Sequence, residues 1–245
     1  MQVRCFYSES IPEAEEAFEL SADEARHAAG VLRLTAGDLI RLTDGRGCRA
    51  EARVVEVTRP RHPQVLCRIE TRTVVEPPSP AIRLYVAPPR GKTMNLVLRS
   101  ATELGVTRIT PILCHYGVSR PDKKGGGKAV WRSELVAALK QSGNPFLPVL
   151  DGAVPFDEAL RNAEEPGVYG HVPEEEGKHG ALPPDGAVGV WVGPEGGFSD
   201  QELLALQTAN FAAISVGPWV LRVETAVTAL LAWVHGHIEN TGTLL

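Results

Sequence analysis

Two glycine-proline segments in the second half of the chain have the residue types and spacing of ligand-binding loops. The first, VGPEGGFS at 192–199, follows an apolar run and precedes a helix start, and the second, VGPWVLRVETA at 216–226, repeats that arrangement. Glycine allows positive φ and close approach of the backbone to a ligand, and ligands bind at the carboxyl ends of parallel strands. We therefore expect the two bends to line one pocket, with tight turns that hold no ligand as the competing interpretation.

The side chains of these bends narrow the class of ligand. Neither segment matches G-x-G-x-x-G or G-x-x-x-x-G-K-[ST], which weakens a dinucleotide or triphosphate interpretation. The carboxylate of Glu195 would repel phosphate and favours a cationic or zwitterionic ligand. Arg222 and Glu224, separated by one apolar residue, are the candidate catalytic residues, and a structural ion pair between them is the alternative.

The elements that must position these bends alternate between strands and helices. We expect strands at 82–87, 109–113, 168–172, 188–192 and 213–216, and helices at 93–104, 129–141, 199–209 and 225–239. The helix at 199 begins with a capping box formed by Ser199 and Glu202. This alternation predicts an α/β fold with a mostly parallel sheet and helices on both faces.

The front of the chain has a different pattern. Short strands are expected at 39–42, 50–57 and 65–69, separated by glycine-containing turns, and a short helix is expected to start at the N-cap Ser21 with Glu24 at its third position. Such strands predict a small β-barrel. The segment Glu-Pro-Pro-Ser-Pro at 76–80 is a stiff linker, so the expected domains are 1–73 and 74–245.

Composition sets the class of protein. The 245 residues include 43% hydrophobic and 22% charged residues, and no apolar run reaches the roughly 18 residues of a membrane span. The N-terminus has no signal-peptide pattern, so a cytoplasmic location is expected. Four cysteines without a C-x-x-C pair favour buried thiols and predict no metal site.

Charge is distributed unevenly although the net charge is −5. Residues 26–73 carry ten Arg against five acidic residues, and residues 81–145 carry eleven Lys and Arg against three, whereas residues 146–245 carry three basic residues against fourteen acidic ones. Basic blocks are typical of phosphate contacts, and a merely solvated surface is an equal alternative. The candidate RNA-contact residues are Arg26, Arg33, Arg46, Arg49, Arg90, Lys92, Arg120 and Lys123.

Four segments, taken together, resemble the RsmE group of ribosomal RNA uridine-N3 methyltransferases, which belongs to the SPOUT class. They are HAAGVLRLTAGD, KTMNLVL with ATELGV and ITP, GPEGGFSDQE and VGPWVLRVETA, in the family's order between about residues 26 and 232. The resemblance implies an N-terminal PUA-like RNA-binding β-barrel, a C-terminal trefoil-knotted α/β domain and a homodimer. It also implies S-adenosylmethionine as cofactor and, as substrate, a uridine of 16S ribosomal RNA in the assembled 30S subunit.

The resemblance also assigns roles to residues. S-adenosylmethionine should contact Gly193, Pro194, Glu195, Gly196, Val216, Gly217, Val220, Leu221, Thr225 and Ala226. His171, Val172 and Pro173 should form the remaining wall of its pocket. Arg222 is expected to stabilise negative charge as uridine N3 loses its proton, and Glu224 to orient Arg222 or accept that proton. The chain departs from the family pattern at five places, which are Ser100, His115-Tyr116-Gly117, Lys140 in place of the usual Glu before Gln141, Asn144 in place of a common Arg, and Trp219 in place of the usual Arg.

Three other functions are compatible with these residues. The chain could be an RNA-binding protein without activity, with the α/β domain as a dimerisation platform, and binding of S-adenosylmethionine would exclude this. It could be a SPOUT methyltransferase that acts on another RNA or position. It could also be a small-molecule enzyme on a nucleotide-binding fold, against which the absent phosphate-binding motifs argue.

Overall fold

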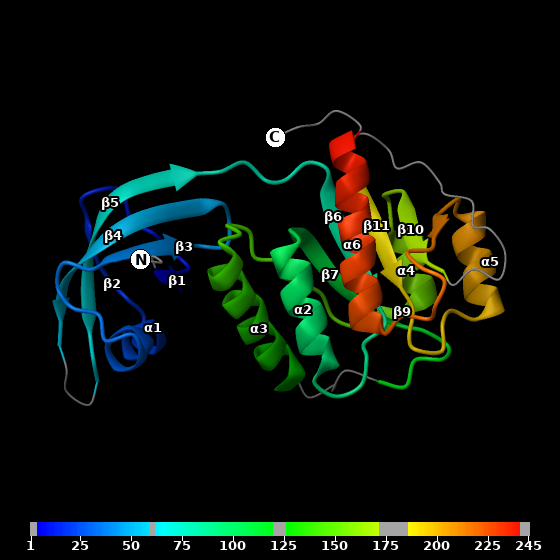
Figure 1. Cartoon of the computed structure of the whole chain (residues 1–245), viewed down its shortest axis with the longest axis horizontal. Helices are drawn as coiled ribbons and strands as arrows, with labels where there is room; N and C mark the ends of the chain where they lie inside the picture. Colours follow the sequence, from blue (N-terminus) through cyan, green and yellow to red (C-terminus); the bar gives the residue numbers. More distant parts are fainter. Residues whose placement is uncertain (1–3, 59–61, 120–125, 172–185, 241–245) are drawn as a thin grey trace. The chain divides into compact units, whose positions relative to one another are not determined.

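The computed structural model describes residues 4–58, 62–119, 126–171 and 186–240, and it divides into two compact units. The first unit comprises residues 1–77 and 139–147, and the second comprises 78–138 and 148–245 (Figure 1). The expected division at 73/74 lies close to the end of the first stretch. The sequence-based boundary did not assign residues 139–147 to the first unit. They belong to it through tertiary contacts, which the sequence does not show.

The first unit is built on a five-stranded sheet with the strand order β1-β3-β4-β5-β2. Its strands are β1 (Arg4–Tyr7), β2 (Ala17–Glu19), β3 (Leu39–Thr43), β4 (Cys48–Val57) and β5 (Val65–Val74). The pair β1–β3 is parallel and the other three pairs are antiparallel. The expected strands at 39–42, 50–57 and 65–69 are confirmed, but β1 and β2 were missed because they are short and defined by their partners.

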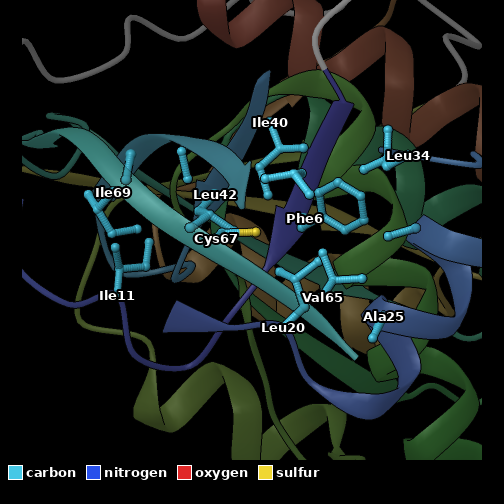
Figure 2. Close-up of a cluster of buried hydrophobic side chains, with 14 of the residues drawn as sticks. Phe6, Ile11, Leu20, Ala25, Leu34, Ile40, Leu42, Val65, Cys67 and Ile69 are labelled. Atoms are coloured by element: carbon cyan, nitrogen blue, oxygen red, sulfur yellow. The ribbon is translucent and has the colours of Figure 1, made fainter. Parts of the chain in front are cut away.

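Alternating apolar residues of these strands form the core of the first unit. Figure 2 shows Phe6, Ile40 and Leu42 gathered with Val65 and Cys67, all at most 1% exposed. Helix α1 (Ala22–Arg26) begins at Ser21, whose hydroxyl accepts a hydrogen bond from the Glu24 backbone, as expected. It continues into one turn of π-helix, η1 (His27–Val31), which was not expected.

Residues 139–147 join this unit through backbone and side-chain contacts. Leu147 N donates to Gly45 O at 2.8 Å, and Gly47 N donates to Pro145 O at 3.0 Å. Lys140 Nζ lies 2.7 Å from a carboxylate oxygen of Glu24. These contacts fix the last turn of helix α3 (Gly126–Ser142) to α1, and the segment that follows this helix to the β3–β4 turn.

The second unit has a parallel sheet with the order β12-β10-β11-β6-β7-β8, and β9 pairs with β7. The strands are β6 (Ala81–Val86), β7 (Val106–Leu113), β8 (Val149–Leu150), β9 (Val154–Pro155), β10 (Gly167–Gly170), β11 (Ala187–Val192) and β12 (Ala212–Ile214). All recorded pairs are parallel, which confirms the α/β prediction. Strands β10 and β12 end two residues earlier than expected, and β8 and β9 were missed because two-residue strands have no local signal.

Helices lie on both faces of this sheet. Helices α2 (Thr93–Glu103) and α6 (Val223–Asn240) pack side by side on one face (Figure 1). Helices α4 (Phe156–Asn162) and α5 (Asp200–Thr208) cover the other face, where Phe156 and Leu206 pack with Tyr85, Tyr169 and Trp191. Helix α4 was not expected because Pro155, its N-cap, gives none of the usual capping signals.

Candidate active site

The first glycine-proline bend is a compact turn between β11 and α5. Gly197 N donates to Pro194 O at 2.8 Å, and Gly197 has φ +75°, a conformation that favours glycine. A Cβ at Gly193 would lie 3.3 Å from the carbonyl carbon of Gly197 and 3.3 Å from the ring of Phe198. The backbone therefore folds back on itself here, and a side chain at position 193 would make tighter contacts than most Cβ atoms make.

A buried carboxylate anchors this bend to the end of a second strand. Glu202, 7% exposed, accepts hydrogen bonds from Ser199 N at 2.8 Å and from Ser199 Oγ at 3.0 Å, which completes the predicted capping box. Its other oxygen accepts from His115 N at 2.8 Å, just after β7. The start of α5 and the end of β7 are thus held together by one side chain.

The second bend follows β12 and leads into α6. Ser215 Oγ donates to Gly217 O at 2.9 Å, and Ala226 N donates to Arg222 O at 2.8 Å in the first turn of α6. A Cβ at Gly217 would meet nothing within 4 Å, so this glycine is not required by packing. The apolar side chains of Trp219 and Val220 are 78% and 72% exposed.

The two bends enclose one cavity of about 350 Å³, within the range of small-molecule sites. It lies where the adjacent strands β10, β11 and β12 end, and His171 N donates to Ile214 O at 3.0 Å beneath it. Its lining comprises Gly170, His171, Val192, Gly193, Pro194, Glu195, Gly196, Gly197, Phe198, Leu203, Ile214, Val216, Gly217, Trp219, Val220, Leu221, Val223, Ala226 and Leu230. Only Glu195 and His171 in this lining have titratable side chains, so the pocket is apolar with one carboxylate.

Most residues expected to contact the cofactor meet around this cavity. Those in the lining are His171, Gly193, Pro194, Glu195, Gly196, Val216, Gly217, Val220, Leu221 and Ala226. Thr225 is exposed and lies outside the lining, and Val172 and Pro173 lie outside the described residues. The meeting of both bends at one pocket is what the sequence predicted, and the contacts with cofactor stay predictions.

Several lining residues were not predicted. Val223 and Leu230 share one face of α6 with the predicted Ala226, at spacings of three and four residues. Helical periodicity could have identified these two from the sequence. Phe198 and Leu203 had no such signal, because their side chains reach the cavity through the fold of the first bend.

Arg222 and Glu224 lie beside the cavity without lining it. Arg222 is exposed at the end of the second bend, and Glu224 is half-buried in the first turn of α6. These two described residues form no ion pair with each other. The alternative that Arg222 and Glu224 are a structural ion pair is therefore not supported. Their catalytic roles stay predictions.

The candidate RNA-contact cations that the structure describes are all exposed. Three have intramolecular partners: Arg26 pairs with Asp23, Arg46 Nη2 donates to Glu9 O at 2.6 Å, and Arg49 Nη2 donates to Gly143 O at 2.5 Å. Arg33, Arg90 and Lys92 form no ion pair with any other described residue. Arg120 and Lys123 lie outside the described residues.

Buried titratable groups of the second unit are structural. Glu165, 6% exposed, accepts from Tyr85 Oη at 2.7 Å and from Arg83 Nη1 at 2.7 Å. Burial, followed by the hydrogen bond to Glu165, raises the pKa of Tyr85 above its ordinary range. Burial, followed by the carboxylate of Glu202, raises the pKa of Cys114, and a thiol held neutral is a poor nucleophile.

Two further findings concern metal ions and membranes. Within the described ranges, no cluster of three or more His, Cys, Asp or Glu is placed to hold a metal ion. None of the helices in these ranges is long and apolar enough to cross a membrane.

Known proteins of similar sequence and structure carry consistent names. A Mycobacterium bovis protein named ribosomal RNA small subunit methyltransferase E is 29% identical over 243 residues, covering 94% of this chain and 90% of that protein. The protein of the same name from Aquifex aeolicus is 29% identical over 73% of this chain and 79% of its own length.

Two solved structures match 96% of this chain. A putative methyltransferase of Legionella pneumophila, solved with bound S-adenosylmethionine, has a TM-score of 0.85 and 29% identity, covering 96% of this chain and 98% of that one. A ribosomal RNA small subunit methyltransferase E of Neisseria gonorrhoeae, also bound to S-adenosylmethionine, has a TM-score of 0.84 and 27% identity over the same shares.

Family models match both parts of the chain. The model of an RNA methyltransferase PUA domain matches residues 20–61, which include α1, β3 and β4 of the first unit. The model of an RNA methyltransferase domain matches residues 76–235, which include both bends, the cavity and all strands of the parallel sheet. The chain therefore belongs to the RNA methyltransferase family defined by this domain, with a PUA domain at its front.

Proposed function

We propose that this chain transfers a methyl group from S-adenosylmethionine to N3 of a uridine in 16S ribosomal RNA, acting on the assembled 30S subunit in the cytoplasm. One observation carries the proposal: both glycine-proline bends enclose a single apolar cavity in a chain similar, over 96% of its length, to two structures with bound S-adenosylmethionine. The names of the relatives support ribosomal RNA of the small subunit as the substrate.

The residues around the cavity fit this cofactor. A cavity of about 350 Å³ suits a ligand of this size, and its only carboxylate, on Glu195, suits a cationic sulfonium. Apolar side chains of Val216, Val220 and Leu221 would contact the apolar parts of the cofactor, and the turn at Gly193 contributes backbone to the same wall. No Lys or Arg in the lining would repel the positive charge.

When bound, S-adenosylmethionine supplies a methyl carbon activated by its sulfonium, so the nitrogen–carbon bond forms as the carbon–sulfur bond breaks and sulfur keeps the electron pair. The chain must therefore align N3 with that carbon and help its proton leave. Uridine N3 is normally base-paired, so the base must be unstacked or flipped before it reaches the pocket.

Arg222 and Glu224 are the side chains proposed to assist proton loss. As N3 loses its proton, negative charge spreads onto the ring oxygens, and the exposed guanidinium of Arg222 beside the cavity can stabilise it. The half-buried carboxylate of Glu224 is the proposed proton acceptor, or it orients Arg222.

The test of the proposal is mass spectrometry of ribosomal RNA nucleosides from cells with and without this protein. Loss of 3-methyluridine from small-subunit RNA, restored by the wild-type gene, is the expected result. Unchanged nucleosides, together with no calorimetric binding of S-adenosylmethionine, would favour an RNA-binding protein without activity. Methylation of another RNA or position would favour a different target for the same chemistry.

Two finer features implied by the family resemblance are also proposed, namely a trefoil knot in the second unit and a homodimer. Sedimentation equilibrium of the purified chain checks the dimer, since a monomer has a mass of 26.4 kDa. A mass near that value at micromolar concentration would contradict it.

A further inference from the structure

Trp219 is the largest apolar side chain exposed at the cavity. It lies in the second bend, lines the cavity, and leaves 78% of its surface in water. The other three tryptophans of the chain are buried or half-buried. A large exposed aromatic beside a concave site indicates a contact that the isolated chain does not supply.

The flat face of an indole is a good surface for a nucleobase. Stacking of a base on an aromatic side chain contributes to affinity, and it requires no particular hydrogen-bonding pattern. Enzymes that modify a flipped base commonly hold it between aromatic or apolar side chains. Trp219 has the chemistry for this, whereas the neighbouring Val220 has no planar face.

The reaction itself needs the ring to be held by its face. The lone pair that forms on N3 when its proton leaves lies in the plane of the uracil ring, so N3 must meet the methyl carbon edge-on. Hydrogen bonds to O2 or O4 hold the edge, whereas stacking holds the face and leaves the edge free. Trp219 borders the cavity proposed for the methyl donor, three residues before Arg222.

We infer that Trp219 is the stacking surface for the target uracil and sets the plane in which N3 approaches the methyl group. This inference rests on the proposed function. Trp219 then acts as a positioning residue that touches substrate, with Arg222 at the other end of the same segment available to the ring oxygens. The donor's adenine and a second copy of the chain are the rival occupants of this surface.

The experiment compares Trp219→Phe and Trp219→Leu in the full-length protein, with 30S subunits from cells that lack the protein as substrate. Leucine keeps an apolar side chain without a planar face, and phenylalanine keeps the plane. We expect Trp219→Leu to lower kcat/KM for the subunit about 10- to 100-fold, mainly through KM, and Trp219→Phe to restore most of it. Leu204→Ala, an apolar side chain 64% exposed on α5, is the control and should leave kcat/KM unchanged.

Two further measurements separate the rival occupants. Calorimetry with S-adenosylmethionine should give a Kd within about twofold of wild type for Trp219→Leu, because leucine keeps an apolar side chain at the cavity wall. Sedimentation should give the same mass for all variants. A weakened donor Kd, or a changed mass that accompanies the loss of activity, overturns the inference.

Failure of the inference can be told from failure of the proposed function. If wild-type protein transfers no methyl group to these subunits, the proposed function fails and this inference with it. If wild type is active and Trp219→Leu has an unchanged kcat/KM, or if Phe and Leu are equally impaired, only the stacking role is excluded.

Discussion

Arg222 is exposed in the second bend, directly before α6, and forms no ion pair with Glu224. We expect Arg222→Ala to lower kcat for methyl transfer about 100- to 1000-fold, because loss of one group that stabilises a developing oxyanion has that effect. Donor affinity should be retained. Single-turnover transfer of labelled methyl to 30S subunits measures this, with Arg161→Ala, exposed on α4, as the control. Full transfer by Arg222→Ala would exclude the role.

Gly193 is held by close packing at the first bend. The Cβ of Gly193→Ala would come 3.3 Å from backbone and from the Phe198 ring, so the turn must shift. We expect the calorimetric Kd for S-adenosylmethionine to rise about tenfold or more. Gly236→Ala in α6 meets nothing within 4 Å and should leave this Kd unchanged. Equal donor affinity in both variants would contradict a cofactor site at this turn.

Burial of Cys67 in the first unit predicts a loss of stability at alkaline pH. Burial raises the pKa of Cys67 to about 11, whereas the thiol of the unfolded chain ionises near about 8.5. Because the folded state holds the proton more tightly, this contribution is full below the unfolded pKa. It falls by about 1.4 kcal/mol per pH unit as the pH rises toward 11.

The measurement is the free energy of unfolding in urea between pH 8 and pH 11 for wild type and Cys67→Ala. The alanine variant should show a shallower decrease with pH, whatever its stability at neutral pH. Parallel curves for the two proteins would show that the Cys67 thiol does not remain protonated in the folded state.

At the scale of elements, the capping box of α5 joins two strand ends. Ser199→Ala should lower the free energy of unfolding by about 1 kcal/mol. Glu202→Ala should lower it more, by about 2–4 kcal/mol, because Ser199 N and His115 N both lose a charged acceptor. Asp200→Ala, an exposed acid in the same turn, should cost at most about 1 kcal/mol.

Urea denaturation of the three variants gives these differences, and donor calorimetry gives their effect on the site. Because Glu202 also fixes the end of β7 beside the first bend, its loss should weaken donor binding as well as stability. A Glu202→Ala variant with the stability of Asp200→Ala would exclude this anchoring role.

At the scale of the whole molecule, the uneven charge predicts salt-dependent RNA binding. Arg33 and Arg90 are exposed and form no ion pair with other described residues. Each alanine substitution should weaken RNA affinity and reduce the slope of log K against log salt by about 1. The measurement is filter binding to 16S RNA between about 50 and 200 mM salt, the range over which the affinity of proteins that contact phosphates falls steeply. Arg161→Ala, in the acidic part of the chain, should change neither quantity.

The sequence by itself determined the longer strands and helices and the two bends, because these depend on local signals. Apolar runs that end in Gly-Pro, the Ser199–Glu202 capping box and the alternation of strands and helices predicted the parallel sheet and the place of the pocket. These signals are short-range preferences of the backbone, so they can be read without knowing the partners of each segment.

Tertiary structure alone decided which distant segments meet. Strands β8 and β9 exist because they pair with β7, and residues 139–147 belong to the first unit because they bind the β3–β4 turn. The fold also placed Phe198 and Leu203 in the cavity and left Trp219 exposed at it. Such contacts join residues far apart in the chain, and their free energy comes from burial and pairing that no local pattern encodes.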